Sequence, residues 1–106
     1  MTTDDWTEHK SRLESFESRL ASAMNDGVAP GSPEANDLAE EHRAILSEWF
    51  AVSHSMHVLI SRGYVADAGF REHYDSRAEG LTKWLVEVIG ANAAANGVDP
   101  ETAEWV

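Results

Sequence analysis

Histidines are the side chains of this sequence with the widest chemistry, because they can bind metals, carry protons or form buried hydrogen bonds. His54 and His57 are three positions apart, which on a helix places them on one face as a workable pair of metal ligands. His42 and Met56 lie nearby in the sequence and raise haem binding as a second interpretation. The chain has no cysteine, and no Asp or Glu stands in the same turn as the pair. We therefore interpret these histidines as packing and hydrogen-bonding groups, and predict no metal and no cofactor.

Catalytic constellations are missing from the sequence. Glu40 and Glu41 are adjacent, so on a helix they point in different directions and do not form a carboxylate pair. Ser53 and His54 are also neighbours, and that spacing alone cannot make a contact between a nucleophile and its base. No glycine-rich phosphate loop is present. We predict that the chain is not an enzyme and has no catalytic residues.

Aromatic side chains are concentrated in the central region of the sequence. Large apolar ligands are held by such rings together with a few placed polar groups. The residues that we predict to bind a ligand are Trp49, Phe50, His54, His57, Tyr64, Phe70, Tyr74 and Trp84. Their helical spacing is also what an ordinary core demands, so which rings line a cleft and which only fill the core stays open.

The helical period dominates the segments that must position these side chains. The first apolar stripe consists of Trp6, His9, Leu13, Phe16, Leu20 and Met24. Residues 25–27, Asn-Asp-Gly, end this helix, because glycine suits the left-handed position after a last turn. Ser32 is then expected to cap the next helix, with Pro33 as its first residue.

The middle of the chain carries two more stripes. The second stripe consists of Leu38, His42, Ile45, Leu46 and Trp49. No glycine or proline interrupts residues 34–62, but residues 52–55, Val-Ser-His-Ser, are weak helix formers, so we expect a break there. Met56, Leu59 and Ile60 form the third stripe, and Gly63 is expected to end it.

Two further helices complete the prediction. Asp67 can cap a short helix that carries Phe70 and Tyr74, and residues 76–79, Ser-Arg-Ala-Glu, resemble a capping box for the last long helix. The stripe of that helix consists of Leu81, Trp84, Leu85, Val88, Ile89 and Asn92, before Asn96-Gly97 stops it. No strand pattern occurs. We predict an all-α fold in which about five helices bury their stripes against one another, as a single domain over residues 1–106 with a C-terminal tail at 97–106.

Composition narrows the classes of function. The chain has 106 residues, 19 acidic and 8 basic, and a net charge of -11, which argues against direct binding to a nucleic-acid backbone. The acidic excess is concentrated at the two ends, so the middle is nearly neutral, as a site for a nearly neutral ligand would be. The first residues are acidic and polar, unlike a signal peptide, and no apolar run spans a membrane. We expect a cytoplasmic protein.

Several short motifs follow one another in a characteristic order. They are Asp37-Leu38-Ala39-Glu40-Glu41-His42-Arg43, Trp49-Phe50, Ser55-Met56-His57, Tyr64-Val65-Ala66-Asp67, Phe70, His73-Tyr74-Asp75, Gly80-Leu81, and Ile89 with Ala91-Asn92-Ala93. At these spacings they resemble the TipAS antibiotic-recognition domain, the ligand-binding part of MerR-type thiostrepton-induced regulators and of albicidin-binding proteins. The resemblance covers residues 5–96 and so nearly the whole chain.

The resemblance implies a globin-like arrangement of helices without haem, and a cleft for thiopeptide-like or polyaromatic antibiotics. Many members of the family carry a DNA-binding helix-turn-helix before this domain, whereas others are free-standing and sequester the drug. Nothing precedes residue 5 here, so we expect a free-standing domain that does not bind DNA itself. Some relatives capture thiopeptides through a cysteine close to the position of residues 51–53, and because this sequence has no thiol, we expect reversible binding.

Two alternatives remain beside antibiotic binding. The same cleft could hold the helix of a protein partner in a regulatory subunit, or the chain could bind haem or a metal. A further hypothesis concerns residues 4–26, whose helix would be marginal alone. Trp6, Phe16 and Leu20 would cover the ligand as a lid that docks weakly without antibiotic and firmly with it.

Overall fold

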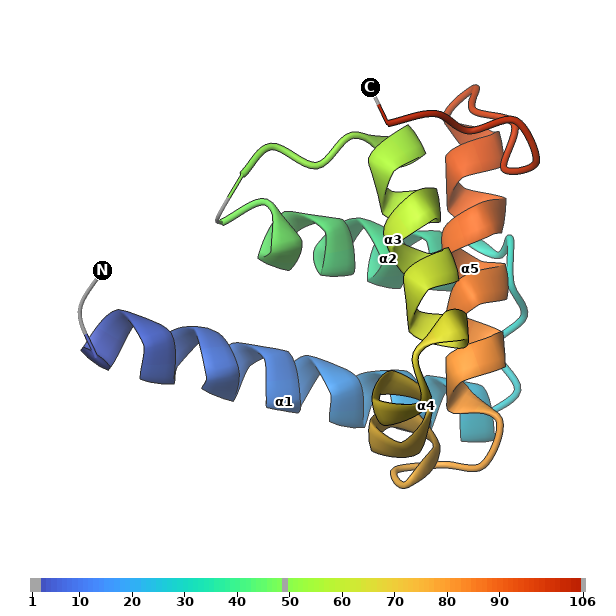
Figure 1. Ribbon diagram of the computed structural model, residues 1–106. Helices are drawn as coiled ribbons and strands as arrows, with labels where there is room; N and C mark the ends of the chain where they lie inside the picture. Colours follow the sequence, from blue (N-terminus) through green and yellow to red (C-terminus); the bar gives the residue numbers. More distant parts are fainter. Residues whose placement is uncertain (1–2, 49, 106) are drawn as a thin grey trace.

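The computed structural model describes residues 3–48 and 50–105, with side chains from residue 6 onward. It contains five helices: α1 (Thr3–Asn25), α2 (Pro33–Leu46), α3 (His54–Ala66), α4 (Ala68–Asp75) and α5 (Leu81–Ala95) (Figure 1). None of the described residues is in a strand. The predicted all-α class and the number of helices are confirmed.

The helices form two antiparallel pairs that cross each other (Figure 1). α1 and α2 run in opposite directions, and α3 and α5 lie side by side across one end of that pair. α4 is a short helix beside the last half of α1. α5 contacts all four other helices, so it is the centre of the fold.

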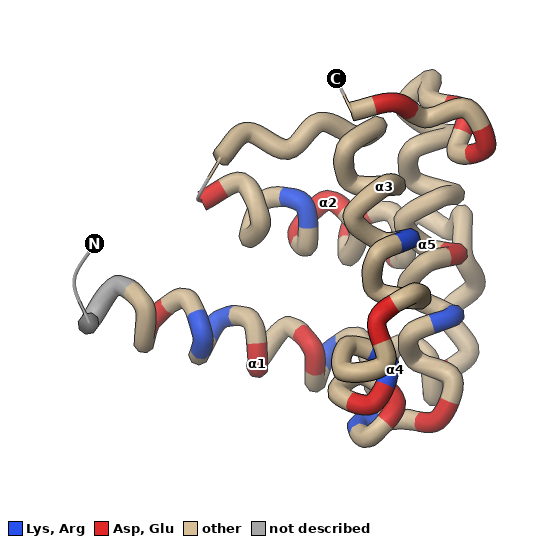
Figure 2. The backbone as a smooth tube through the Cα atoms, in the orientation of Figure 1, with Lys and Arg blue, Asp and Glu red and all other residues tan. Residues whose placement is uncertain are grey.

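The core explains this central place of α5. Every residue of the stripe predicted for α5 is buried: Leu81, Trp84, Leu85, Val88, Ile89 and Asn92. α1 contributes Phe16 and Leu20, which are both fully buried. In Figure 2 charged residues are frequent along α1, α2 and α4, whereas α3 has a single charged residue, Arg62. The apolar period of the sequence therefore located the main buried faces.

Among the described residues, three helices begin at side-chain caps, where an oxygen accepts the N–H of the residue three positions later. Ser32 caps α2 with Pro33 in the first turn, and Asp67 caps α4, both as predicted. Ser53 caps α3 through the N–H of Met56. The expected break near residues 52–55 is thus real, but α2 already ends at Leu46.

The predicted capping box at residues 76–79 is wrong. Ser76 ends α4, and α5 begins only after Gly80, which has a φ of 84° and offers no side chain. Asp75 supplies the missing acceptor, since its Oδ1 accepts the N–H of Thr82 at 3.0 Å. A glycine in the left-handed conformation lets the chain turn between the two helices, and the preceding helix then caps the following one.

The stripe predicted for α3 is confirmed only in part. Met56, Leu59 and Ile60 are half-buried, and of these Ile60 packs against the core. The buried residues of α3 are Ser55, His57, Val58, Ser61 and Tyr64, and the helix continues past Gly63 to Ala66. Small serines allow α3 to pack closely on α5, and their hydroxyls are satisfied, that of Ser61 by the carbonyl of Val58 at 2.6 Å. A search for apolar residues cannot find a buried face that is partly polar.

Residues 97–105 fold back onto the helices. Val98 and Ala103 pack against the core, and the Ser55 hydroxyl donates to the Glu104 carbonyl at 2.5 Å. The separation of a 5–96 core from a 97–106 tail stays a prediction. Within the described part of the chain, no helix combines the length and apolar character needed to cross a bilayer.

Candidate functional site

An aromatic cluster of three rings, Tyr64, Phe70 and Tyr74, joins α3 to α4. Tyr64 stacks on Phe70 with ring centroids 4.6 Å apart, and its centroid lies 5.7 Å from that of Tyr74. Both tyrosines are buried, whereas 43% of Phe70 is exposed. The cluster therefore has a solvent-facing edge, formed by Phe70, on which a further flat ring could stack.

A pocket of about 310 Å³ lies at this edge. It is lined by Asp67, Gly69, Phe70 and His73, all from α4 or its cap. The Oδ1 of Asp67 accepts the N–H of Phe70 and so fixes the first turn that carries the ring. We call this hollow the α4 pocket; Phe70 belongs both to it and to the aromatic cluster.

A buried carboxylate lies behind the cluster. Glu17 of α1 is only 2% exposed, and its Oε1 lies 2.9 Å from Nε2 of His73 and 3.1 Å from a terminal nitrogen of Arg77. The hydroxyl of Tyr74 also bonds to Glu17. Burial, Tyr64 and the charge of Glu17 together raise the pKa of Tyr74, which stays protonated and donates. This network connects the middle of α1 to the helix that carries the α4 pocket.

A second buried contact joins α2 to α3. Nδ1 of His42 and Nε2 of His57 are 2.7 Å apart, and both imidazoles are almost completely buried. Burial lowers the pKa of each ring, and for His57 the neighbouring His42 and Arg43 lower it further. His42 also stacks on Phe16 and meets the edge of Tyr64, so this neutral pair continues the aromatic cluster inward.

Glu40 forms a polar junction between three helices. Its carboxylate accepts hydrogen bonds from Arg43, from Nε2 of His54 at 3.0 Å and from Nδ2 of the buried Asn92 at 3.0 Å. The bond from Arg43, above all, lowers the pKa of Glu40 to about 2. Arg43 also donates to the Val52 carbonyl at 2.8 Å, which holds the connection before α3 in place.

Comparison with known proteins identifies the family. The profile of the TipAS antibiotic-recognition domain matches residues 1–92. The chain belongs to this family. It is also 29% identical over 93 residues to the HTH-type transcriptional activator TipA of Streptomyces coelicolor, and equally so to that of Streptomyces lividans. The match covers 87% of the chain but only 37% of each TipA protein. No solved structure matches the chain.

The TipAS domain brings together three of the predicted ligand-binding residues, Tyr64, Phe70 and Tyr74. His57 adjoins them only through His42, and His54 is bonded to Glu40. The described residues contain no group of three or more side chains that could hold a metal. Whether any of these residues binds a ligand stays a prediction.

The other predicted residues lie elsewhere in the TipAS domain. Trp84 is buried and its Nε1–H donates to the Val28 carbonyl at 3.0 Å, so it packs the connection between α1 and α2. Phe50 is 49% exposed and lies beside Trp105, with ring centroids 6.3 Å apart. Trp49 lies outside the described residues. Of the predicted lid, Phe16 and Leu20 are fully buried and Trp6 is 55% exposed.

Sequence reasoning missed Glu17, His73 and Arg77. One signal was available: Glu17 stands beside Phe16 and three positions before Leu20, on the same helical face. A carboxylate within an apolar stripe is costly unless it is paired, so its presence predicts a basic partner. The partner's identity was not readable, because it depends on how α4 packs on α1.

Proposed function

We propose that this TipAS domain reversibly binds bulky hydrophobic antibiotics, thiopeptide-like or polyaromatic, with the aromatic cluster and the α4 pocket as the contact surface. The observation that carries the proposal is Phe70, which lines the pocket while it stacks on Tyr64. The family's description as an antibiotic-recognition domain supports the class of ligand. In a cell the domain would sequester the drug or report its presence to a regulator.

The chemistry of the site supports a large and mostly uncharged ligand. Phe70 offers an exposed ring face, while the tyrosine hydroxyls are already engaged with each other and with Glu17. The pocket alone, at about 310 Å³, is at the small end for a drug-sized molecule. A thiopeptide would therefore place one ring or side chain in the pocket and extend over the neighbouring surface.

Replacing Phe70 by Ala is expected to weaken binding of thiostrepton or an albicidin-like oligoamide at least tenfold, because loss of a stacked aromatic contact removes both apolar area and ring-ring attraction. Tryptophan fluorescence titration measures the dissociation constant. Phe50→Ala is the matched control, since Phe50 is the same residue type with similar exposure but lies beside Trp105. Its affinity should stay within twofold of the parent.

If Phe50→Ala weakened binding more than Phe70→Ala does, the antibiotic site would lie beside Phe50 and Trp105 instead. That result would contradict the proposal. Mass spectrometry of the same complexes after denaturation checks reversibility. The chain has no cysteine, so the unmodified protein mass should return.

The lid hypothesis is retained as part of this proposal. We expect residues 4–26 to gain protection from hydrogen exchange when antibiotic binds, most of all in the first turns around the exposed Trp6. The middle of α1 should change least, because Glu17 already connects it to His73 and Arg77. If the first turns of α1 are as protected as residues 81–93 in the free protein, there is no lid. Trp6→Ala should weaken antibiotic binding more than it lowers the free energy of unfolding.

A further inference from the structure

Two basic side chains stand apart from the others in this acidic chain. The sequence has 8 Lys and Arg residues against 19 Asp and Glu. Those with a carboxylate partner are Lys10, Arg12, Arg19, Arg43 and Arg77. Arg62 donates instead to the Pro100 carbonyl. The remaining two, Arg71 and Lys83, form no ion pair with any residue that the structure describes.

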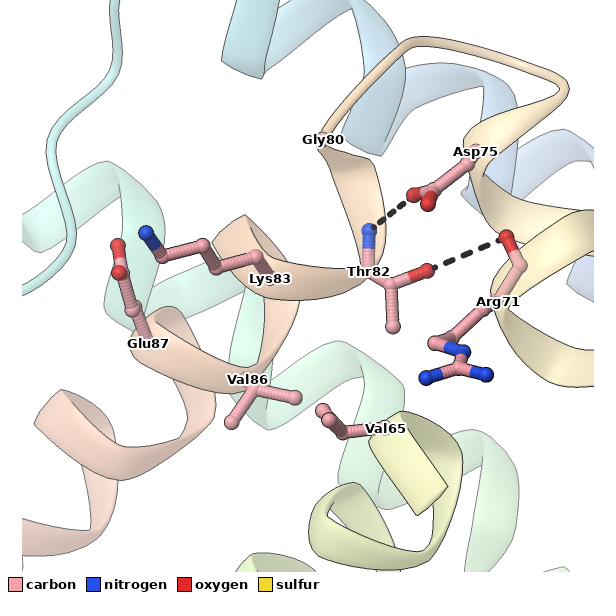
Figure 3. A pocket seen from close by; sticks show the side chains of 8 residues that line it. All are labelled: Val65, Arg71, Asp75, Gly80, Thr82, Lys83, Val86 and Glu87. Atoms are coloured by element: carbon pink, nitrogen blue, oxygen red, sulfur yellow. Dashed lines mark hydrogen bonds between the residues drawn. The ribbon is translucent and has the colours of Figure 1, made fainter. Parts of the chain in front are cut away.

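Arg71 and Lys83 line one pocket (Figure 3). Its volume is about 420 Å³, within the range of small-molecule sites. The pocket lies between the end of α3, α4 and the start of α5, and is lined by Val65, Arg71, Asp75, Gly80, Thr82, Lys83, Val86 and Glu87. We call it the α3–α5 pocket.

The floor of this pocket is apolar. Val65 and Val86 point toward each other across it, with the Thr82 side chain beside them (Figure 3). Among the described residues, Val65 is one of the few large hydrophobic side chains that are substantially exposed, at 41%. Covering this exposed valine with a ligand is favourable by about 25 cal/mol per Å² of apolar area removed from water. The two cations flank this floor on opposite sides (Figure 3).

Two carboxylates also line the pocket and limit what it can accept. Asp75 is engaged at the start of α5, where it accepts the N–H of Thr82. Glu87 stands one turn after Lys83 and forms no ion pair with it. The formal charge of the lining is therefore zero, in a chain whose net charge is -11. An anion that approaches this pocket meets unpaired cations and no local excess of negative charge.

We propose that the α3–α5 pocket is a second ligand site, for a medium-chain alkyl carboxylate. The carboxylate lies against the Arg71 guanidinium, whose planar fork matches it, and the positive charge of Lys83 adds a longer-range attraction from the far side of the apolar floor. The alkyl chain covers Val65 and Val86. The site is separate from the α4 pocket, because the two share no lining residue and use different faces of α4.

Decanoate is the probe that tests the site. Titrated into the ¹⁵N-labelled domain below its micelle concentration, it should produce saturable shifts of the amide signals of Val65, Thr82 and Val86. Decanol, with the same chain and no charge, should bind at least tenfold more weakly. The variant Arg71→Gln/Lys83→Gln should also lose at least tenfold in affinity, because the contact with Arg71 and the longer-range attraction of Lys83 are both removed.

Arg62→Gln is the matched control, since it removes one positive charge from an exposed position outside the pocket, and it should bind decanoate as the parent does. Phe70→Ala should also leave decanoate binding unchanged, which separates this site from the antibiotic site. The proposal is overturned if decanol binds as tightly as decanoate, if the double variant keeps its affinity, or if the shifts appear at Phe70 and His73 instead.

Discussion

Acidification from pH 7.5 to 4.5 is expected to lower the free energy of unfolding by about 3 to 5 kcal/mol, chiefly through the pair formed by His42 and His57. Burial lowers the pKa of His42 from 6.5 to about 4 and that of His57 from 6.5 to about 3. As the pH falls below 6.5, these two imidazoles therefore become protonated in the unfolded chain but stay neutral in the folded chain. The contribution of the pair to the free energy of unfolding is fully present above pH 6.5. It is lost progressively as the pH falls toward the pKa values of the folded state.

The surroundings of His42 explain why it stays neutral in the folded state. Nε2 of His42 is buried and has no hydrogen-bond partner among the described residues, and Nδ1 is already shared with His57. A protonated His42 would carry two N–H donors, one of them facing no acceptor, in a site without access to water. His9 adds a change of the same sign, because burial and Arg12 lower its pKa.

Urea unfolding followed by tryptophan fluorescence at several pH values measures the effect. His57→Gln removes one titrating ring and should roughly halve the loss between pH 6.5 and 4.5, whatever its stability at pH 7.5. NMR signals of the imidazoles provide an independent check, since His42 and His57 should remain neutral at pH 5.5. A free energy of unfolding that is flat from pH 7.5 to 5 would contradict the assignment.

Replacing Arg77 by Met should cost about 3 kcal/mol, whereas Glu17→Gln should cost only about 1 kcal/mol. The asymmetry follows from burial. Glu17 is 2% exposed, so without Arg77 its charge stays buried, with only His73 and the hydroxyl of Tyr74 as partners among the described residues. The Arg77 and His73 side chains are 27% and 51% exposed, so without the Glu17 charge they can turn to water.

The double variant Glu17→Gln/Arg77→Met completes the test, because it should be about as stable as Glu17→Gln alone. Arg19→Met is the matched control, since Arg19 also lies on α1 and pairs with Glu41, but both partners are largely exposed. It should cost less than about 1 kcal/mol. If Glu17→Gln lowers the free energy of unfolding as much as Arg77→Met does, Arg77 does not stabilise the fold by neutralising the buried charge of Glu17.

The sequence predicted those parts of the fold that depend on local pattern. The stripe of α5, the cap at Asp67 and the Ser32-Pro33 start of α2 follow from apolar period and hydrogen-bonding side chains, and the structure confirms them. The buried face of α3 was missed because Ser55 and Ser61 are polar and small, and only packing against α5 and the C-terminal segment makes them core residues.

The candidate site shows the same limit. The concentration of aromatic residues in the middle of the chain singled out Tyr64, Phe70 and Tyr74 as candidate ligand-binding rings, but it singled out Trp84 equally. Trp84 lies on another side of the core, where it packs against the connection between α1 and α2. Helical spacing within one segment does not show which other segments that helix will contact. The basic partners of Glu17 were missed for this reason too.

The junction at Glu17 has a consequence for how related sequences diverge. A buried acid that depends on bases from another helix is tolerable only while they are present, and an arginine at position 77 gains little once the acid is gone. Positions 17 and 77 should therefore change together in evolution, with chains that carry an apolar residue at 17 free to lose the base at 77. Covariation of these two positions among related sequences would then reveal the contact between α1 and α4 without a structure.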